Sequence, residues 1–449
     1  MKDTMKVKNC IIGGGLTGIS VAHFLGEEAV ILEKDSLAGG LCRSFKKGPF
    51  TYDIGGHIIF SKDQEVLNFM VDILGKNKRK LYRNNKIFFK NIFVKYPFEN
   101  GLYMLPKEDL FFCIHNFINN NYPEPKNFRE WMFHRFGKGI AELYLVPYNE
   151  KIWKYPLENM SMDWVERIPR PPAEDIIKSA IGIETEGYTH QLYFYYPING
   201  GIQSLIEAIK ESLPKENVKL KLNSEVRSIK KTKIGWLVET VSGERIEAER
   251  LINTMPIFDL VRCFEDVPND VKKAMEKLVY NSLYVILVGV RNPNMKDKLG
   301  IYIPDKGVIF HRMVLNGYFG DEYCGKENSA ISAEITFPVG SDLDRMKEKD
   351  VLERVLSDLE KIGFIKRDEV IETEVKKIKY AYVVYDKGYK ENVEIIRRYF
   401  ENEGVHLCGR FAEFDYINMD ACIRHAMELA KKLKRENMKK GGIGTGNDD

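Results

Sequence analysis

The sequence predicts an α/β fold in which a Rossmann-like nucleotide-binding domain carries an inserted helical domain and a mostly antiparallel β-sheet domain. Three observations support this prediction. A glycine-rich turn joins an apolar strand to a helix near the start of the chain, helix-like apolar spacing dominates residues 63–183, and strand patterns dominate residues 278–385. At 449 residues the chain is long enough for two or three packed units.

The first forty residues read as strand, glycine turn, helix and strand, in the runs "VKNCIIGGG", "LTGISVAHFLGEE" and "AVILEKD". This order is typical of a right-handed βαβ unit. Helix-like spacing follows in "DQEVLNFMVDILGK", "KEDLFFCIHNFINN" and "NFREWMFHRFGKGIAELYLVPY". Between the first two of these, the alternating run "KIFFKNIFVKYPF" predicts a β hairpin.

Further along, "YPINGGIQSLIEAIKESL" predicts a strand, a loop and a helix, and residues 218–255 predict paired strands that end in the buried run "RLINTM". The last helix is expected in "MDACIRHAMELAKKLKRENM". We therefore expect discontinuous domains. The nucleotide-binding domain comprises residues 1–65, 199–260 and 396–436, the mainly helical substrate domain residues 66–190, the antiparallel sheet domain residues 261–395, and a disordered tail residues 437–449.

Composition excludes several classes of function. Lysine plus arginine number 68 against 65 for aspartate plus glutamate, and this net charge of +3 indicates neither a nucleic-acid footprint nor a polybasic membrane face. The longest apolar run, "SLYVILVGV", is too short for a membrane span and reads as a buried strand. The opening residues show no signal-peptide pattern, so a cytoplasmic location is expected.

Cysteine and histidine spacing argues against a disulfide framework and against a metal site. The seven cysteines are scattered and form no CxxC pair, and the eight histidines form no HExxH motif. We expect reduced thiols and no bound metal.

The strongest motif is a dinucleotide site. Gly13, Gly15 and Gly18 form GxGxxG directly after an apolar strand and before a helix. The first glycine permits a tight turn, the second lets backbone approach a pyrophosphate, and the third allows close helix packing. Glu33 closes the second strand, where a carboxylate can accept hydrogen bonds from a ribose diol. The alternative is a purely structural glycine turn.

After Glu33 the chain continues "KDSLAGGLCRSF", and its Gly39–Gly40 pair, followed by Leu41, resembles FAD-binding proteins related to amine oxidases and UDP-galactopyranose mutases. The C-terminal run "VHLCGRFAEFDYINMDACIRHAM" resembles their last strand and a helix whose N-terminal amides can face the flavin N1 and O2. The resemblance implies FAD as cofactor. It places five residues at the flavin: Gly409, Arg410, Asn418, Met419 and Asp420. For Asp420 the alternative is plain helix capping.

Other segments are similar to UDP-galactopyranose mutases, especially the eukaryotic type. "GGHIIFSKD" resembles the histidine loop of that family, which implies that Gly56 and His57 lie against the flavin ring, with His57 near N5. The alternative for His57 is a satisfied structural side chain. In "VKYPFENGLYMLPKEDL", Tyr96 and Phe98 match the aromatic clamp for uracil, although two such residues also suit ordinary strand packing. Glu99 departs from the expected glutamine, which puts the identity of the nucleobase in question.

Two more segments complete the resemblance. "LVPYNEKIWKYPLENMSMDWVERIP" is similar to the stretch that contacts nucleotide and diphosphate, with Asn149 and Trp153 four residues apart, as on one helix face, and Arg167 as a diphosphate-binding arginine. "IYIPDKGVIFHRMVLNGYFG" supplies a second such arginine, Arg312. Three tyrosines match phosphate-contacting positions: Tyr318 (after an interval one residue shorter), Tyr382 and Tyr416. Each of these residues alone is equally compatible with a surface or packing role.

The resemblance implies a flavin-dependent mutase that interconverts UDP-galactopyranose and UDP-galactofuranose, or a close nucleotide sugar, through an adduct between the sugar and N5 of reduced FAD. Such a role belongs to cell-surface glycan biosynthesis. We expect His57, Arg167 and Arg312 as catalytic residues, a UDP-sugar as substrate and NAD(P)H as the external reductant. The alternatives are an FAD-dependent oxidoreductase of the amine oxidase or protoporphyrinogen oxidase type and a flavin-bound module without catalysis. The sequence leaves the oligomeric state open.

Overall fold

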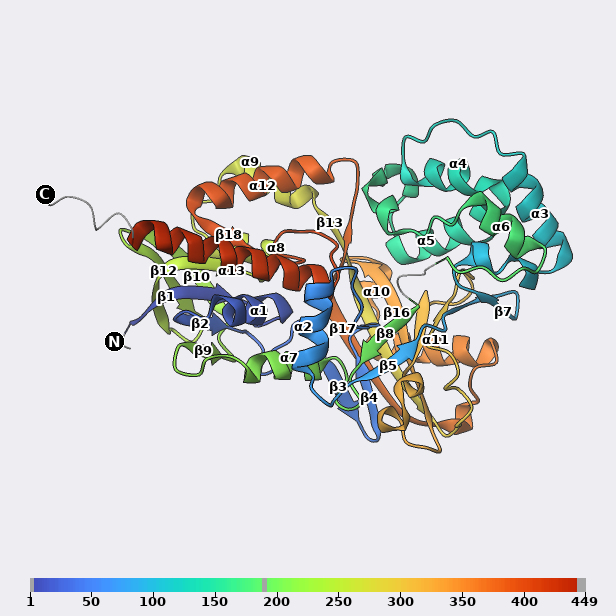
Figure 1. Cartoon of the computed structure of the whole chain (residues 1–449), viewed down its shortest axis with the longest axis horizontal. Coiled ribbons are helices and arrows are strands. Elements are labelled where there is room, and N and C mark those ends of the chain that lie inside the picture. Colours follow the sequence, from blue (N-terminus) through green and yellow to red (C-terminus); the bar gives the residue numbers. More distant parts are fainter. Residues whose placement is uncertain (1–3, 188–191, 442–449) are drawn as a thin grey trace, which may run out of the picture.

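A computed structural model describes residues 4–187 and 192–441, and its α/β architecture confirms the predicted fold class (Figure 1). The nucleotide-binding part is a seven-stranded sheet in the order β10-β11-β12-β1-β2-β9, with β18 also paired to β12. Strands β9, β2, β1, β12 and β18 run parallel, and β10 and β11 extend the sheet antiparallel. The strands are β1 (Met5–Ile12), β2 (Ala29–Leu32), β9 (Val218–Lys221), β10 (Val226–Thr232), β11 (Gly235–Thr240), β12 (Arg245–Asn253) and β18 (Val405–Leu407).

Helices cover both faces of this sheet, because the two sides of each buried strand are apolar. Ile11 and Ile31 belong to one hydrophobic cluster with α1, α2, α7 and α13, whereas Cys10 and Val30 belong to a second cluster with α8, α9 and α12. The period of two along β1 and β2 therefore fixes which helices each side chain meets. The helices are α1 (Leu16–Leu25), α2 (Gln64–Ile73), α7 (Gln203–Glu211), α8 (Ile257–Cys263), α9 (Asn269–Lys277), α12 (Tyr389–Glu403) and α13 (Met419–Gly441).

A second seven-stranded sheet runs in the order β17-β13-β16-β15-β14-β6-β7, antiparallel except between β14 and β6. Helix α11 packs its apolar stripe against one face of this sheet, in the cluster around Val351, Val355 and Leu359. The elements are β6 (Lys86–Phe89), β7 (Ile92–Lys95), β13 (Val279–Val290), β14 (Gly300–Tyr302), β15 (Arg312–Leu315), β16 (Ser329–Pro338), β17 (Val370–Val384), α10 (Asp342–Arg345) and α11 (Glu348–Lys361).

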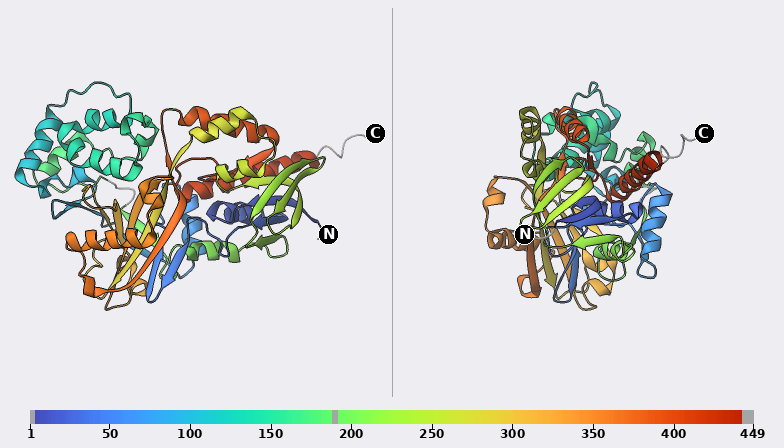
Figure 2. Two further views of the ribbon diagram at one scale, coloured as in Figure 1. Left: turned by 180° about the vertical axis from the view of Figure 1, so that it is seen from behind. Right: turned by 90° about the vertical axis from the view of Figure 1, so that its left-hand side faces the viewer.

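Helices α3 to α6 form a lobe at the end of the molecule far from β1, as seen from behind in Figure 2. Within α4 the backbone kinks at Gly137, whose φ of 71° and close approach to Asn116 exclude a larger residue, and the π-helix Ala141–Leu145 then leads into α5. The helices are α3 (Lys107–Ile118), α4 (Phe128–Ile140), α5 (Val146–Trp153) and α6 (Ala173–Ala180). Two two-stranded antiparallel sheets complete the fold: the hairpin of β3 (Ser44–Lys47) with β4 (Phe50–Asp53), and the pair of β5 (Arg79–Tyr82) with the distant β8 (Tyr193–Tyr196).

Several local predictions are confirmed, among them the βαβ unit β1-α1-β2 and the hairpin β6-β7, which adds two strands to the antiparallel sheet from within the segment predicted to be mainly helical. Helix α13 continues through Gly441, so the start of the predicted tail is helical, and residues 442–449 lie outside the described residues. The domain boundaries stay a prediction. All seven cysteines are free and buried. Across residues 4–187 and 192–441, every helix is too short or too polar to cross a bilayer.

Candidate active site

The GxGxxG segment forms the turn between β1 and α1. Gly13 has φ of 103°, and its N–H donates to the Leu32 carbonyl at 2.9 Å. A Cβ on Gly18 would lie 2.0 Å from the Gly13 carbonyl oxygen, so only glycine lets α1 begin this close to the turn. At Gly15, in contrast, the first atom that a Cβ would meet is 3.8 Å away. The predicted roles of tight turn, open backbone and close packing fit this geometry.

Glu33 follows β2 directly and its side chain is buried. Its carboxylate accepts the N–H of Gly14 at 2.8 Å and the N–H of Asp35 at 2.9 Å, one on each oxygen. A carboxylate has lone pairs for about four hydrogen bonds. Both oxygens can therefore still accept from a ribose diol beside the glycine turn.

The second glycine pair lies against the first segment. Gly39 forms a β-bridge with Gly15, its N–H donates to the Gly14 carbonyl at 2.8 Å, and the Cα of Gly40 lies next to Gly15. Gly39 and Gly40 have φ of 128° and 58°, which favour glycine at both positions. Leu41 follows, partly buried between two hydrophobic clusters. Two stretches of bare backbone thus form a cradle that any Cβ would begin to fill, as a bound diphosphate requires.

The C-terminal glycine and arginine approach the same region. Gly409 has φ of 100°, and a Cβ there would lie 2.5 Å from the Thr17 hydroxyl of α1. Arg410 donates to the carbonyls of Ile417 at 2.9 Å and Ala381 at 2.7 Å, and its guanidinium lies 3.9 Å from the ring centre of Tyr416. Its Nε is buried without a partner, and Arg410 makes no ion pair within the described part of the chain. This cation is therefore held in place but not neutralised.

The start of α13 is tied to the loop that follows His57. The Asp420 carboxylate accepts from the Ser61 hydroxyl at 2.6 Å, while Asn418 provides the carbonyl that accepts the Cys422 N–H at 3.0 Å. Met419 packs, partly buried, against the core shared by α1 and α13. Asp420 thus contacts a distant loop. Its carboxylate bonds to Ser61 and does not cap its own helix, which was the alternative interpretation.

His57 lies near two cations, Arg312 and Arg410. Burial, then the charges of Arg410 and Arg312, lower its pKa to about 4, against a smaller opposite effect of the Gly55 backbone. The imidazole is therefore neutral at pH 7. Its Nδ1 is buried and has no partner among the described residues. Next to it, Gly56 is exposed, and a Cβ on Gly56 would lie 3.4 Å from Val314 and 3.8 Å from the Arg312 guanidinium.

Arg312, the first residue of β15, is held by Glu334 of the neighbouring strand β16. Its Nε and Nη2 donate to the two carboxylate oxygens at 3.1 Å and 2.6 Å, in a bidentate pair. Glu334 is fully buried, while 23% of the Arg312 side chain is exposed. Burial acts to lower the pKa of Arg312, but the Glu334 carboxylate and nearby tyrosines raise it well above its usual value.

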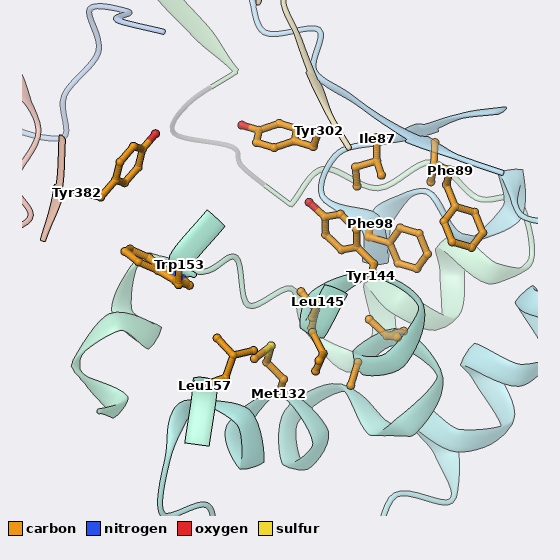
Figure 3. Packing of buried hydrophobic residues seen from close by; sticks show 14 of the residues in the cluster. Ile87, Phe89, Phe98, Met132, Tyr144, Leu145, Trp153, Leu157, Tyr302 and Tyr382 are labelled. Carbon is orange, nitrogen blue, oxygen red and sulfur yellow. The ribbon is translucent and has the colours of Figure 1, made fainter. Parts of the chain in front are cut away.

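Four tyrosines surround the two arginines. The Tyr382 ring lies 5.6 Å from Tyr416 and 6.2 Å from Trp153, and Tyr148 lies 5.5 Å from Tyr302. Burial raises the pKa values of Tyr148 and Tyr382, so both hydroxyls stay protonated and can donate. Figure 3 shows Trp153 and Tyr382 on one side of this cluster and Tyr302 on the other, with the hydroxyl ends of the two tyrosines turned toward the space between them.

The predicted aromatic clamp divides between two partners. Tyr96 stacks on Tyr302 at 4.4 Å, whereas Phe98, which begins the 3₁₀ helix Phe98–Asn100, is fully buried and stacks on Tyr144 at 5.0 Å. Because the strand β7 ends before this pair, the two rings do not share a strand face. Glu99 is 2% exposed, and burial raises its pKa to about 7.

Asn149 and Trp153 lie on one face of α5, as their spacing predicts. The Trp153 indole N–H donates to the Asn149 side-chain oxygen at 3.1 Å, and the Asn149 amide donates to the Leu145 carbonyl at 2.8 Å. Trp153 is fully buried. The Trp153 ring, held by this hydrogen bond, packs against Tyr382 and Tyr416. The polar groups of Asn149 and Trp153 are both hydrogen-bonded within the protein.

Replacing Trp153 by phenylalanine is expected to destabilise the protein by about 1–2 kcal/mol more than the same change at Trp236, because it leaves the buried Asn149 oxygen without a donor. Trp236 is 4% exposed, and its indole makes no hydrogen bond within the described residues, so that variant loses ring volume and weakens a contact with the Lys231 cation 5.7 Å away, but leaves no buried acceptor without its donor. Urea unfolding of both variants measures the difference. Equal losses would show that the hydrogen bond adds nothing.

One predicted residue, Tyr318, lies apart from this cluster. The Tyr318 hydroxyl donates to the Tyr82 carbonyl, and its ring packs with Ile58, Phe60 and Leu81 in a separate hydrophobic cluster. Arg167 ends the 3₁₀ helix Met162–Arg167, and its side chain lies outside the described residues. The cluster described above therefore consists of Arg312, Arg410 and the four tyrosines near them, without Tyr318.

Sequence reasoning missed Tyr148, Tyr302 and Glu334. One signal was available for Glu334: it is the only charged residue in the otherwise apolar run "SAISAEITFP", and a charge inside a buried strand calls for a partner. Tyr302 faces Arg312 through the β14–β15 register, which cannot be read without the strand pairing.

The comparisons with known proteins agree with this geometry. A family model described as flavin containing amine oxidoreductase matches residues 176–432, more than half of the chain. The chain belongs to this family. A model of NAD(P)-binding Rossmann-like domains also matches residues 11–74, which contain the glycine turn and Glu33. As a member of the flavin-containing amine oxidoreductases, the protein is a flavin-dependent enzyme.

Solved structures share the fold of this flavin-containing amine oxidoreductase. A reduced UDP-galactopyranose mutase is 24% identical with a TM-score of 0.86, covering 95% of this chain and 93% of that one. A candidate protoporphyrinogen oxidase from Exiguobacterium sp. 255-15 is 17% identical with a TM-score of 0.75 over 97% and 99% of the two chains. Wild-type putrescine oxidase bound to putrescine is 15% identical with a TM-score of 0.66 over 96% and 100%.

A relative by sequence is an uncharacterized protein in the nifH2 3′ region of Methanothermococcus thermolithotrophicus. It is 43% identical over 56 residues, which are 12% of this chain and 54% of that protein. The chain thus spans about half the length of that relative.

Proposed function

We propose that the protein is a flavin-dependent nucleotide-sugar mutase that interconverts UDP-galactopyranose and UDP-galactofuranose, or a close nucleotide sugar, with reduced FAD as its cofactor. The observation that carries this proposal is the pair of cations beside His57. Arg312 and Arg410 act together on the His57 pKa, and phenolic donors surround them. A group of oriented cations and hydroxyl donors suits a diphosphate.

The residues present fit FAD. The backbone cradle of Gly15 and Gly39 suits its pyrophosphate, and Glu33 suits the adenosine ribose. The unneutralised cation of Arg410 and the unpaired Nδ1 of His57 are the groups proposed to face the isoalloxazine ring. When bound, reduced FAD supplies the nucleophile for exchange at the anomeric carbon and ends the cycle still reduced.

The side chains are proposed to bind and stabilise the departing diphosphate. Glu334 fixes the Arg312 fork, so this cation needs no reorganisation as negative charge develops on the phosphate oxygens. Tyr382 stays protonated and can donate a hydrogen bond to the same oxygens. Loss of one such donor costs roughly a hundredfold in rate. We further propose Arg167 as the second diphosphate arginine, and Tyr96, Phe98 and Glu99 at the nucleobase.

The alternative is an amine or protoporphyrinogen oxidase. The family and two of the similar structures favour it, since they include a putrescine oxidase. Against it stands the charge of the site: a cationic amine would approach Arg410, which has no ion pair among the described residues, while the charge of Arg312 is offset by Glu334. Repulsion between like charges favours an anionic substrate.

The test is conversion of UDP-galactofuranose by purified holoprotein. After anaerobic reduction with dithionite, we expect UDP-galactopyranose to appear in chromatography, with no conversion in an oxidised control. Anaerobic bleaching of the flavin by NADPH or NADH tests the proposed reductant in the same samples. Oxygen-dependent turnover of an amine or a porphyrinogen, with no sugar conversion, would replace this proposal by the oxidase.

A further inference from the structure

His311 is a buried histidine whose two ring nitrogens have no hydrogen-bond partner in the part of the chain that the structure describes. It precedes Arg312, its N–H donates to the Glu334 carbonyl at 3.0 Å, and its own carbonyl accepts the Ile303 N–H at 2.9 Å. The side chain is 1% exposed, and both ring nitrogens lack a partner within the described residues. A buried polar group without a hydrogen-bond partner lowers the stability of the fold. We therefore expect the ring of His311 to gain a partner when a ligand binds.

The neighbours of His311 belong to the candidate active site. Its ring lies 6.3 Å from that of Tyr382 and 6.4 Å from that of Tyr148, and its Nε2 is 3.8 Å from the Glu334 carboxylate. This last distance is too long for a hydrogen bond. His311 therefore faces the cluster that holds Arg312, and it takes part in none of the bonds found there.

The charge state of His311 limits the chemical groups that its ring can bind. Burial, followed by the charges of Arg312, Lys151 and Lys154, lowers its pKa well below the usual value, against the opposite effect of the Glu334 backbone. A neutral imidazole offers one donor and one acceptor. A diphosphate at neutral pH only accepts, and would leave the acceptor nitrogen unpaired. A hydroxyl group can accept from the N–H or donate to the bare nitrogen, so it can pair with whichever ring nitrogen faces the site, whereas a diphosphate can pair with the N–H alone.

We propose that His311 binds a hydroxyl group of the hexose carried by the nucleotide, and that it selects for this sugar beside the diphosphate site of Arg312. This inference rests on the proposed mutase function. It assigns the sugar to the part of the cluster beside Tyr382 and Tyr148, whose rings lie 6.3 Å and 6.4 Å from that of His311. Neither the glycine motifs nor the predicted phosphate-binding residues include this position.

The test is calorimetric binding of UDP and of UDP-galactose to oxidised holoprotein. His311→Leu is expected to weaken UDP-galactose binding about five- to tenfold, as for one lost hydrogen bond, and to change UDP binding less than twofold. His311→Gln, which keeps a donor and an acceptor, should recover most of the loss. His406→Leu, a change at a histidine of β18 whose pKa is also lowered by burial, is the matched control and should alter neither affinity.

The outcomes separate this inference from the proposed function. If the wild type binds neither ligand, the mutase proposal and the inference fail together. If it binds both and His311→Leu leaves UDP-galactose affinity unchanged, or weakens both ligands equally, the inference is overturned while the mutase proposal stands. Should His311→Leu fail to fold, His311→Phe, which keeps a ring but removes both polar atoms, decides: a loss of affinity for UDP-galactose alone supports the inference, and an unchanged affinity or a loss equal for both ligands contradicts it.

Discussion

Replacing Glu99 by glutamine is expected to stabilise the protein by roughly 3 kcal/mol at pH 8 and to change its stability little at pH 4. Glu99 is 2% exposed, and within the described residues it has no ion-pair partner. Burial raises its pKa from 4.5 to about 7, a difference that corresponds to about 3 kcal/mol. Glutamine keeps the shape, one acceptor and one donor group, as the protonated acid does.

The direction in which stability changes with pH follows from the linkage between ionisation of Glu99 and folding. Below pH 4.5 the carboxyl is protonated in both folded and unfolded chains, and Glu99 carries no penalty. Between pH 4.5 and about 7 the unfolded chain loses this proton while the folded chain retains it, so the stability of the wild type falls as pH rises. Above about pH 7 the folded wild type carries the full cost of burying an ionised Glu99 carboxylate. The glutamine variant has no such charge and does not lose this stability.

Urea unfolding at pH 4, 6 and 8 measures this difference. Glu216→Gln, a change at an exposed glutamate in the turn before β9, is the matched control and should shift stability equally little at each pH. A gain for Glu99→Gln that is the same at every pH would contradict a titrating carboxyl. A loss at pH 8 would mean that the carboxylate has a favourable partner.

Local patterns predict the fold because the signals for it are short-range. The βαβ unit needs only an apolar strand, glycine spacing and a helix, and all three lie within residues 5–32. The hairpin β6-β7 follows from alternation over a few residues, but its place beside β14 does not. The pairing of β14 with β6 joins segments more than two hundred residues apart, and no local pattern encodes that contact.

The site was less predictable because it is made from distant strands. The positions of Arg312 and Tyr382 were predicted, yet the partner that orients Arg312 comes from β16 through strand register. The prediction that Arg410 lies at the flavin stays a prediction, and its described contacts are with two backbone carbonyls and the Tyr416 ring. Tyr318 lies three residues after β15, where a 3₁₀ turn directs its hydroxyl to Tyr82. Spacing gives the order of these residues along the chain but not the direction in which each points.

Replacing Arg312 by methionine is expected to destabilise the protein by about 3–5 kcal/mol, because the fully buried Glu334 carboxylate then has no cation. In the double variant Arg312→Met/Glu334→Gln most of this loss should disappear, since a neutral amide is far less costly to bury than a carboxylate. Urea unfolding of the single and double variants measures both effects. Equal losses in the two would show that packing, not charge, holds this pair together.

An exposed ion pair provides the control. Arg227 donates to Glu239 at 2.7 Å, but 57% of its side chain is exposed, so Arg227→Met should cost less than about 1 kcal/mol. The bond lengths are similar, and the comparison therefore isolates burial as the cause.

The double variant also separates folding from function. Once Glu334→Gln has restored stability, what Arg312→Met still removes is the oriented cation, and UDP binding should fall tenfold or more relative to Glu334→Gln alone. Glu334→Gln by itself keeps the charge but loosens the fork, so it should reduce turnover more than binding. If UDP affinity stays the same in all three variants, Arg312 is a structural residue, and the anion site must lie around Arg410.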